Sequence, residues 1–473
     1  MVSATPASNI LTSDLRQLAA DVLSKALKAG ASDAEAVVYE GDEFETRVRL
    51  GQVEMLKESG SRAVGLRVFI GQRTASTSSS DFSRESIHRL VEGAITLAKI
   101  TSEDPFAGLP EAAAFGTLEG DLALYFEDVN EQAPAERIEI ARRAEAAAMA
   151  FDTRIQNSGG GDFDTATSHK ILMNSRGFTG AYQRSYCGFS VAPIAEDEKG
   201  SMQRNYWYSS SRTVKRLESP EEIGRIAAER TLRRLGARQV KTQKAPVVFS
   251  PEIARSIIGN IFEAANGDAI YRHASFFSEM LGERVAGENV TVVDDGTLVF
   301  DFDSADEDGM RVGAFGTSPF DGEGLPTRRT VLVENGILKN YVMNTYTARK
   351  LGMASTGNAS RGLAGNPGIG AGNFYLEPGT LTPEQLIGDV QDGLYVTETM
   401  GFGVNLVTGD YSQGASGLWI ENGELAYPVE EITIAGNLKD MYRNIVAIGN
   451  DLVFRGKSAS PTIRVEGMTI AGS

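Results

Sequence analysis

Apolar residues recur at helical spacing in several stretches of the chain. Between Leu15 and Leu27 they fall at i, i+3, i+4 and i+7, which predicts a helix with Thr12 or Ser13 as its N-cap. At Ser219 the run Ser-Pro-Glu-Glu supplies an N-cap, a proline at the first helical position and two acids in the first turn. Further helices are predicted from Ser83, over Pro134–Met149, over Ser250–Ala265 and, as a short one, near Pro383–Asp389.

Between these helices, short apolar runs alternate with polar residues and glycines, which is typical of antiparallel strands. Such runs fill Ala36–Ser80, with turns expected at Gly41, Gly51, Gly60 and Gly71, and Arg154–Arg212, with turns expected at Gly159–Gly161, Gly177 and Gly200. The order helix, strands, helix therefore occurs twice, and Ser102–Gly120 is the expected joint.

The second half of the chain is predicted to be mostly β. Asn335-Gly336 and Asn422-Gly423 each lie between alternating apolar residues, a strong hairpin signal. We therefore expect an α+β fold, with two N-terminal units of helix, antiparallel strands and helix followed by a mostly β C-terminal domain. The expected domains cover residues 12–115, 120–238 and 240–473.

Composition narrows the class of protein. The 473 residues carry a net charge of −17 and no run of Lys or Arg longer than two, which argues against direct nucleic-acid binding. Cys187 is the single cysteine, so an intrachain disulfide and a cysteine-based metal cluster are excluded, and a buried structural thiol is expected. No secretory signal and no membrane-spanning run is visible, which predicts a cytoplasmic protein.

Local motifs for catalysis are weak. The three histidines, His88, His169 and His273, lie in different predicted elements, so no local metal-binding spacing exists, and each is expected to be structural or solvated. The acidic run Asp301–Gly309 lacks the glycine and glutamate positions of a calcium loop, and a solvated acidic loop is the better interpretation. The glycine-rich Gly365–Gly372 precedes a strand and no helix, which disfavours a phosphate-binding loop.

Two adjacent carboxylates, Asp294 and Asp295, precede Gly296. They could share a proton as a catalytic dyad. In a strand, however, two adjacent side chains point to opposite faces and could not share a proton. We therefore prefer to interpret this segment as a turn.

Several long segments resemble the TldD/PmbA family, specifically its PmbA (TldE) branch. The match runs essentially end to end, and the carrying segments are Gly60–Arg84, Thr291–Thr297, Ser318–Leu325, Ser355–Arg361, Asn373–Thr380 and Gly393–Asp451. The resemblance implies a peptidase complex of a TldD-type and a TldE-type subunit that acts on unfolded peptides in an enclosed cavity. The old family name, modulator of DNA gyrase, suggests a DNA partner, but the net charge of −17 argues against direct contact.

The family places zinc in the TldD-type subunit, on a His-Glu-x-x-x-His helix and a later cysteine. The corresponding helix here, Ser250–Ala265, has no histidine, and Asn437–Ser473 has no cysteine. The resemblance therefore implies a non-catalytic subunit without catalytic residues, metal ligands or cofactor of its own. Its expected partner is a zinc-bearing TldD-type subunit in a heterodimer, with a homodimer when the chain is alone.

Two alternatives remain open: a stand-alone peptide-binding or chaperone-like module, and a metal-independent hydrolase that uses a carboxylate dyad. For peptide binding, glycine-rich strand edges are expected to leave backbone groups free for pairing with an extended chain. The expected cavity-lining residues are Gly401, Gly403, Asp410, Tyr411, Gly414 and Ser416.

Overall fold

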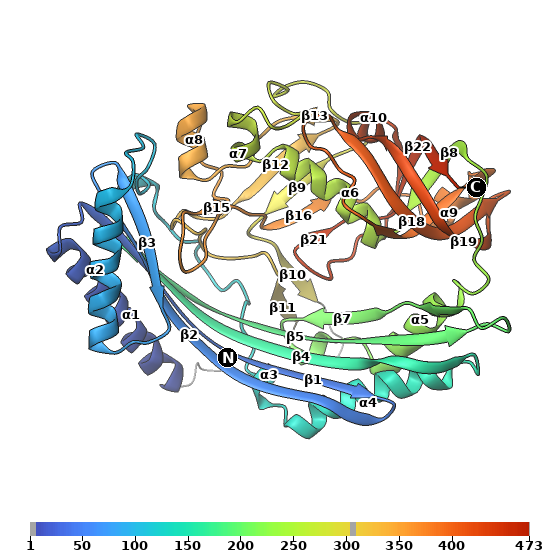
Figure 1. Ribbon diagram of the computed structural model, residues 1–473, viewed down its shortest axis with the longest axis horizontal. Coiled ribbons are helices and arrows are strands. Elements are labelled where there is room, and N and C mark those ends of the chain that lie inside the picture. Colours follow the sequence, from blue (N-terminus) through green and yellow to red (C-terminus); the bar gives the residue numbers. More distant parts are fainter. Residues whose placement is uncertain (1–5, 303–308, 473) are drawn as a thin grey trace.

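A computed structural model describes residues 6–302 and 309–472 of the chain. A long, curved sheet carries helices on one face, and the β-rich C-terminal domain lies over the other face (Figure 1). The α+β class, the helix–strand units of the N-terminal half and the β-rich C-terminal half are as predicted. Most of the predicted acidic loop at Asp301–Gly309 lies outside the described residues.

One sheet serves both N-terminal units. Its strands are β1 (Asp33–Arg49), β2 (Gln52–Ile70), β3 (Arg73–Ser79), β4 (Ile155–Asn174), β5 (Thr179–Glu196), β6 (Met202–Arg204) and β7 (Trp207–Ser211). The order is β3-β2-β1-β4-β5-β6, with β7 also paired to β5. Antiparallel pairing of β1 with β4 joins the two units, so they share one sheet and not two separate ones.

The helices of the N-terminal half cover one face of this sheet. They are α1 (Pro6–Lys28), α2 (Arg84–Ile100), α3 (Asp128–Glu131), α4 (Pro134–Ala150) and α5 (Pro220–Leu232). On β1, Ala36 and Val38 pack with α1 and α2, while Phe44 and Val48 pack with α4 and α5. Side chains alternate along a strand, so the odd-numbered neighbours such as Glu35 face the C-terminal domain.

The C-terminal domain is built on two larger sheets. The first has the order β13-β12-β9-β16-β21, with strands Ile337–Leu338, Arg329–Glu334, Val292–Asp295, Asn373–Leu376 and Ser458–Ala459. The second has the order β19-β18-β17-β8-β22-β20, with strands Glu424–Asn437, Asp410–Glu421, Asp392–Met400, Gln243–Phe249, Ile463–Ala471 and Ile445–Ile448. Two short pairs complete the strands: β10 (Val299–Phe302) with β11 (Met310–Gly313), and β14 (Ala359–Ser360) with β15 (Gly368–Ile369).

Helix α6 (Pro251–Ala264) packs its apolar side against both sheets of this domain, in the largest hydrophobic core of the chain. The remaining helices are short: α7 (Gly267–Tyr271), α8 (Thr345–Leu351), α9 (Pro383–Gly388) and α10 (Leu438–Arg443). Both predicted Asn-Gly hairpins are confirmed, and Asn335, Gly336, Asn422 and Gly423 all have positive φ, as the turn type requires.

Several predicted boundaries are wrong. Helix α1 begins at Pro6, so Thr12 and Ser13 lie inside it and neither is its N-cap. Gly41 and Gly60 lie within strands β1 and β2, and Gly159–Gly161 lie within β4 at a bulge.

Close backbone approach explains two of these glycines. A Cβ at Gly41 would come within 2.7 Å of the Thr167 carbonyl oxygen, and one at Gly161 would overlap the Ala141 carbonyl of α4. These glycines permit tight packing within long strands and do not mark turns. The predicted joint, Ser102–Gly120, runs against the C-terminal domain, where Leu118 N donates to the Pro319 carbonyl oxygen at 2.9 Å.

Candidate functional site

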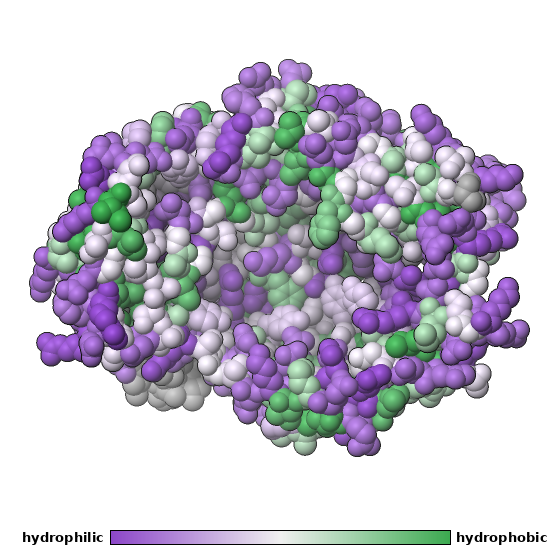
Figure 2. Space-filling view, viewed as in Figure 1, coloured by the Kyte–Doolittle hydropathy of each residue, from purple (hydrophilic) through white to green (hydrophobic). Residues whose placement is uncertain are grey.

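A hollow separates the curved sheet from the C-terminal domain, and Figure 2 shows it as a depression between the two halves of the molecule. A cavity of about 370 Å³ lies between β4, β5 and loops of the C-terminal domain, and we call it the inter-domain cavity. Its lining includes Lys170, Tyr182 and Arg184 from the sheet and Asp294, Asn358, Gly370 and Lys457 from the C-terminal domain.

Strand register explains why the sheet residues meet in this cavity. Lys170 on β4 pairs with Tyr182 on β5, and Arg184 follows two residues later on the same face. Their neighbour Ile171 points the other way, into the core under α1 and α2. The alternation that buries one face of the strands therefore presents two cations and a phenol to the hollow.

Lys170 and Arg184 on the sheet side of the cavity lie across from Lys457 on the side of the C-terminal domain, where the carboxyl groups of Asp294 and Asp321 also line it. Within the described residues, Lys170, Arg184 and Lys457 form no ion pair. Arg184 lies over the Tyr182 ring, at 4.7 Å from its centroid, and donates to the Thr317 carbonyl oxygen at 3.2 Å. Because the chain as a whole is strongly acidic, an unpaired group of cations is a local feature that needs its own explanation.

Arg212 adds a fourth charge behind the sheet side of the cavity. Among the described residues, its guanidinium donates to backbone carbonyls alone, including those of Gly313 at 2.7 Å and Ala314 at 2.9 Å. Burial lowers the pKa of Arg212 to about 9, and repulsion by Arg184 contributes. Carbonyl oxygens satisfy its donors but leave its positive charge uncompensated.

The charges act together on Tyr182. Burial alone would raise the pKa of its hydroxyl, but the positive charges of Lys170, Arg184, Lys457 and Arg212 outweigh that effect and lower it. Partial desolvation lowers the pKa of Lys457, and repulsion by the neighbouring cations lowers it further, although the residue is exposed on the water side of the hollow. The cavity thus has a positive potential at its sheet side.

Asp294 contributes an unusual carboxyl group to the same cavity. It is 2% exposed; its Oδ2 accepts a hydrogen bond of 2.6 Å from Asn358 Nδ2, while Oδ1 has no partner among the described residues. Burial raises the pKa of Asp294 to about 7, and the charge of Lys457 opposes that rise. At neutral pH this carboxyl can therefore either donate or accept a proton.

The adjacent aspartate serves a different purpose. Thr297 donates to Asp295 Oδ1 through its backbone N at 2.8 Å and its hydroxyl at 2.7 Å. Among the described residues no hydrogen bond links the two carboxyl groups. The preferred turn interpretation is wrong for both aspartates, which end strand β9, because the turn begins only at Gly296.

A second buried group of charges lies between the sheet and the C-terminal domain, and we call it the boundary charge cluster. It consists of Glu35, Arg67, Asp321, Glu323 and Arg361. Glu35 forms ion pairs with both arginines. Burial raises the pKa of Asp321 to about 7 and also raises that of Glu323, while it lowers the pKa of Arg361 to about 10.

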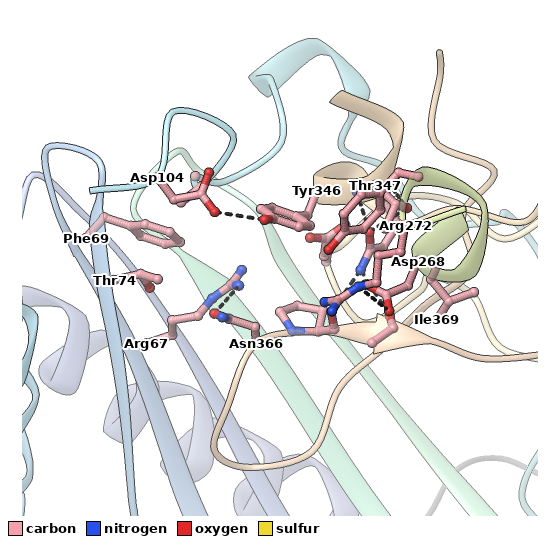
Figure 3. A pocket seen from close by; sticks show the side chains of 17 residues that line it. Arg67, Phe69, Thr74, Asp104, Asp268, Arg272, Tyr346, Thr347, Asn366 and Ile369 are labelled. Atoms are coloured by element: carbon pink, nitrogen blue, oxygen red, sulfur yellow. Dashed lines mark hydrogen bonds and ion pairs between the residues drawn. The ribbon is translucent and has the colours of Figure 1, made fainter. Parts of the chain in front are cut away.

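Beside this cluster is a pocket of about 300 Å³, shown in Figure 3. The polar groups around it largely satisfy one another. Tyr346 donates to Asp104 Oδ2 at 2.8 Å, and Arg272 forms an ion pair with Asp268 at 3.1 Å. The first contact holds the predicted joint against α8, and the second joins Arg272 to α7 itself, so the pocket offers less unsatisfied chemistry than the inter-domain cavity.

The six predicted cavity residues lie elsewhere. Gly401 is in an exposed bend, Asp410 accepts from Thr408 Oγ1 and Asn437 Nδ2, and Tyr411 and Ser416 are buried. None of the six lines the two pockets described above. Their role as a peptide-cavity lining stays a prediction.

The strand edges at these positions are occupied by other parts of the chain. Strand β18 has a neighbour on each side, because Gly414 pairs with Met400 of β17 and with Thr433 of β19. At Gly403, the carbonyl oxygen accepts a hydrogen bond from Ser412 N at 2.6 Å. The other glycine-rich segment does reach the hollow: Gly370 and Gly372 line the inter-domain cavity.

Helix α6 corresponds to the helix on which the resemblance predicts zinc ligands in a TldD-type subunit, and its core-facing side is apolar. Ile257, Ile258 and Ile261 of α6 lie within the core of the C-terminal domain. Aliphatic side chains cannot ligate a cation, so these three core-facing positions of α6 do not fit a zinc site. In residues 6–302 and 309–472, no three His, Cys, Asp or Glu side chains converge as a metal site.

The histidines and the cysteine have structural surroundings. His88 is exposed and faces Glu92 one helical turn away in α2, whereas burial lowers the pKa of His169 beneath α1. Cys187 is fully buried, and burial raises the pKa of its thiol, as expected for a structural cysteine.

The sequence analysis did not predict that Lys170, Arg184 and Lys457 lie around one cavity. Tyr182 and Arg184 at alternate positions of a predicted strand are a weak signal for a shared face, but nothing local links them to Lys457. The cavity exists only because the C-terminal domain folds back over the sheet.

Comparison with known proteins assigns the family. Models described as PmbA/TldA metallopeptidase domain 1, central domain and C-terminal domain match residues 34–98, 127–235 and 242–472. The chain is 38% identical to metalloprotease PmbA of Escherichia coli O157:H7, over 97% of each chain. It is 36% identical to a metalloprotease PmbA homolog of Haemophilus influenzae, over 97% of this chain and 96% of that one.

Solved structures agree on the fold. A putative modulator of DNA gyrase from Bacteroides thetaiotaomicron has a TM-score of 0.88 and 27% identity, over 97% of this chain and 99% of that one. TldE from Thermococcus kodakarensis has a TM-score of 0.82 at 21% identity, over 96% and 100% of the chains, and shows the fold alone. No helix within the described ranges is long and apolar enough to cross a membrane. The chain belongs to the PmbA/TldD metallopeptidase family.

Proposed function

We propose that this chain is the non-catalytic subunit of a two-subunit peptidase, whose zinc-bearing partner is a TldD-type chain. The carrying observation is the packing of α6. Ile257, Ile258 and Ile261 are each at most 1% exposed and contribute to the central core of the C-terminal domain. A core of this kind has neither the ligands nor the open coordination position that a catalytic zinc site needs.

The proposed contribution of this subunit is to bind unfolded peptide. The hollow between the sheet and the C-terminal domain provides space, and β14 and β15 form a two-stranded sheet beside it. Among the described residues, β15 pairs as a strand with β14 alone, and Asn344 Nδ2 donates to the Gly368 carbonyl oxygen at 3.3 Å. The proposal is that an extended chain pairs with the remaining edge at Ile369. Backbone pairing of this kind is largely independent of the peptide sequence.

Reconstitution tests the proposal. The purified chain is mixed with a TldD-type subunit that has a His-Glu-x-x-x-His motif, and cleavage of an unfolded peptide is followed by mass spectrometry. We expect cleavage only by the mixture, with loss of activity on addition of 1,10-phenanthroline. A mixture with the partner's motif histidines replaced controls for contaminating peptidases. Failure of the two chains to associate, with homodimers in both samples, would contradict the proposal.

Asp294 favours a second candidate function, a metal-independent hydrolase. A buried carboxyl with a raised pKa and an unpartnered oxygen in a cavity has the properties of a general acid or base. The separate hydrogen bonds of Asp294 and Asp295 do not support the dyad form of this idea. Peptide cleavage by the pure chain that resists chelator and disappears in Asp294→Asn would establish it.

A further inference from the structure

The inter-domain cavity has more positive charge than the fold requires. Arg212 is used structurally, since its donors are consumed by backbone carbonyls. Lys170 and Lys457, by contrast, have no hydrogen-bond or ion-pair partner among the described residues, and both line the cavity. Cations that only stabilised the fold would be paired with some of the chain's 63 acidic residues.

The geometry of the wall defines what would fit it. Lys170 and Arg184 project from adjacent strands on one side, and Lys457 projects from the segment before β21 on the other. Asp294, which is 2% exposed and whose Oδ1 is unpartnered among the described residues, lies on the same side as Lys457, as does the buried Asp321 of the boundary charge cluster. A small anion between the two walls would meet cations from both, and a protonated Asp294 would add a hydrogen bond.

The volume of the cavity favours the charged end of a peptide chain over a small free anion as its ligand. The cavity of about 370 Å³ is larger than a single carboxylate or phosphate requires. Gly370 and Gly372 line it with backbone, and Gly370 N donates to the Asn358 carbonyl at 2.9 Å, so a strand-like segment lies beside the cations. An extended peptide along this segment would place its last residue within reach of the charges.

We propose that Lys170, Arg184 and Lys457 bind the C-terminal carboxylate of a short peptide in the inter-domain cavity. This inference rests on the proposed peptide-binding function and specifies it. The cations would hold short peptides by their end, whatever their side chains. The proposal concerns binding only and requires no reaction in this chain.

Calorimetry on the purified full-length chain tests the inference. Two N-acetylated, six-residue peptides of glycine, alanine and serine are compared, identical except that one ends in a free carboxylate and the other in an amide. We expect the acid to bind at least tenfold more tightly than the amide. In Lys170→Met and Lys457→Met this preference should fall to less than threefold, while the affinity for the amide is unchanged.

Two further variants control for other effects. Lys199→Met removes a positive charge from an exposed turn far from the cavity lining and should keep the full preference. Lys457→Arg keeps the charge and should also retain it. Thermal unfolding of each variant separates loss of binding from loss of folding, and Lys457 is exposed, so its substitution is expected to leave the melting temperature unchanged.

Inorganic phosphate distinguishes a chain end from a free anion. We expect phosphate to bind at least tenfold more weakly than the peptide acid. Equal affinity for phosphate, with the same dependence on Lys457, would overturn the proposal in favour of a small-anion site. Equal binding of acid and amide, absence of binding, or a preference that survives both methionine substitutions would also overturn it. Equal binding of acid and amide by this chain, together with cleavage of both by the reconstituted complex, would leave the proposed function standing and remove only this inference.

Discussion

Glu35 on β1 and Arg361 of the C-terminal domain form an ion pair across the boundary between sheet and domain, with side chains 0% and 1% exposed. Glu35 pairs with Arg67 as well, and the buried Glu323 also acts electrostatically on both guanidinium groups. The opposite charges are supplied by segments far apart in the sequence, and water reaches neither. The contact therefore links the two halves of the chain at a point where burying either charge without the other would lower the stability of the fold.

Removal of this carboxylate should destabilise the chain strongly. In Glu35→Ala, Arg67 and Arg361 would stay buried without their shared ion-pair partner, and we expect a loss of about 3–5 kcal/mol in the free energy of unfolding. Urea denaturation followed by circular dichroism measures it. Glu139→Ala removes an exposed partner of Arg142 and should change stability by less than about 1 kcal/mol. Equal effects of the two substitutions would show that the buried pair has no special role.

Asp294 should make stability depend on pH. Its pKa of about 7 in the folded chain lies above the ordinary value of 3.8, so between these values the folded state binds more protons than the unfolded state. The free energy of unfolding should therefore fall as pH rises from about 4 to 7, by up to about 1.4 kcal/mol per pH unit, and level off above pH 7.

Asp294→Asn isolates this contribution, because an amide keeps the acceptor for Asn358 and cannot ionise. The difference in melting temperature between this variant and the wild type should grow from pH 5 to pH 7 and then stay constant. A difference that is the same at every pH would mean that the carboxyl titrates normally.

Substitution of Gly403 tests whether the glycines that were predicted to line a peptide cavity are instead needed for close packing of the backbone. A Cβ at this position would overlap the Ser412 carbonyl oxygen, so Gly403→Ala should lower the melting temperature. At Gly259 in α6, a Cβ would meet no atom within 4 Å, and Gly259→Ala should stabilise the chain by about 0.5–1 kcal/mol through helix propensity. A stable Gly403→Ala variant with weakened peptide affinity would instead support the predicted cavity role.

The purified chain should hold no stoichiometric zinc. The residues of α6 offer only aliphatic side chains at the core-facing positions Ile257, Ile258 and Ile261, so no tight site is expected there. Elemental analysis after dialysis should give less than about 0.1 zinc per chain, with the TldD-type partner as the positive control. One tightly held zinc per chain would contradict both this expectation and the proposed division of roles.

Local signals in the sequence predicted local structure well. Ser83 and Ser219 act as N-caps, each accepting a hydrogen bond from the backbone N three residues later, and Asn335 and Asn422 adopt the positive φ of hairpin turns. These features depend on a few neighbouring residues, so the sequence alone specifies them. Gly41 misled the prediction because its partner, the Thr167 carbonyl, belongs to a strand that is distant in the sequence.

The candidate site could not be predicted from local sequence signals either, because its residues come from segments that are distant in the sequence. Lys170 and Arg184 are adjacent in space because β4 pairs with β5, which the strand pattern could suggest. Lys457 and Asp294 join them only through the docking of the C-terminal domain, and burial raises the pKa of Asp294. The domain boundaries at 12–115, 120–238 and 240–473 stay a prediction, although the two N-terminal units share a sheet.

The shared sheet also constrains how the chain can fold during its synthesis. β1 pairs with β4 from Glu35↔Asn174 to Val48↔Gly161, so β1 has one open edge until β4 has left the ribosome. At about 5–20 residues per second, that interval lasts on the order of ten seconds. An unpaired strand edge of this length can pair with a strand of another nascent chain. The negative charges of Glu43 and Glu45 oppose such pairing between identical chains, because like charges repel.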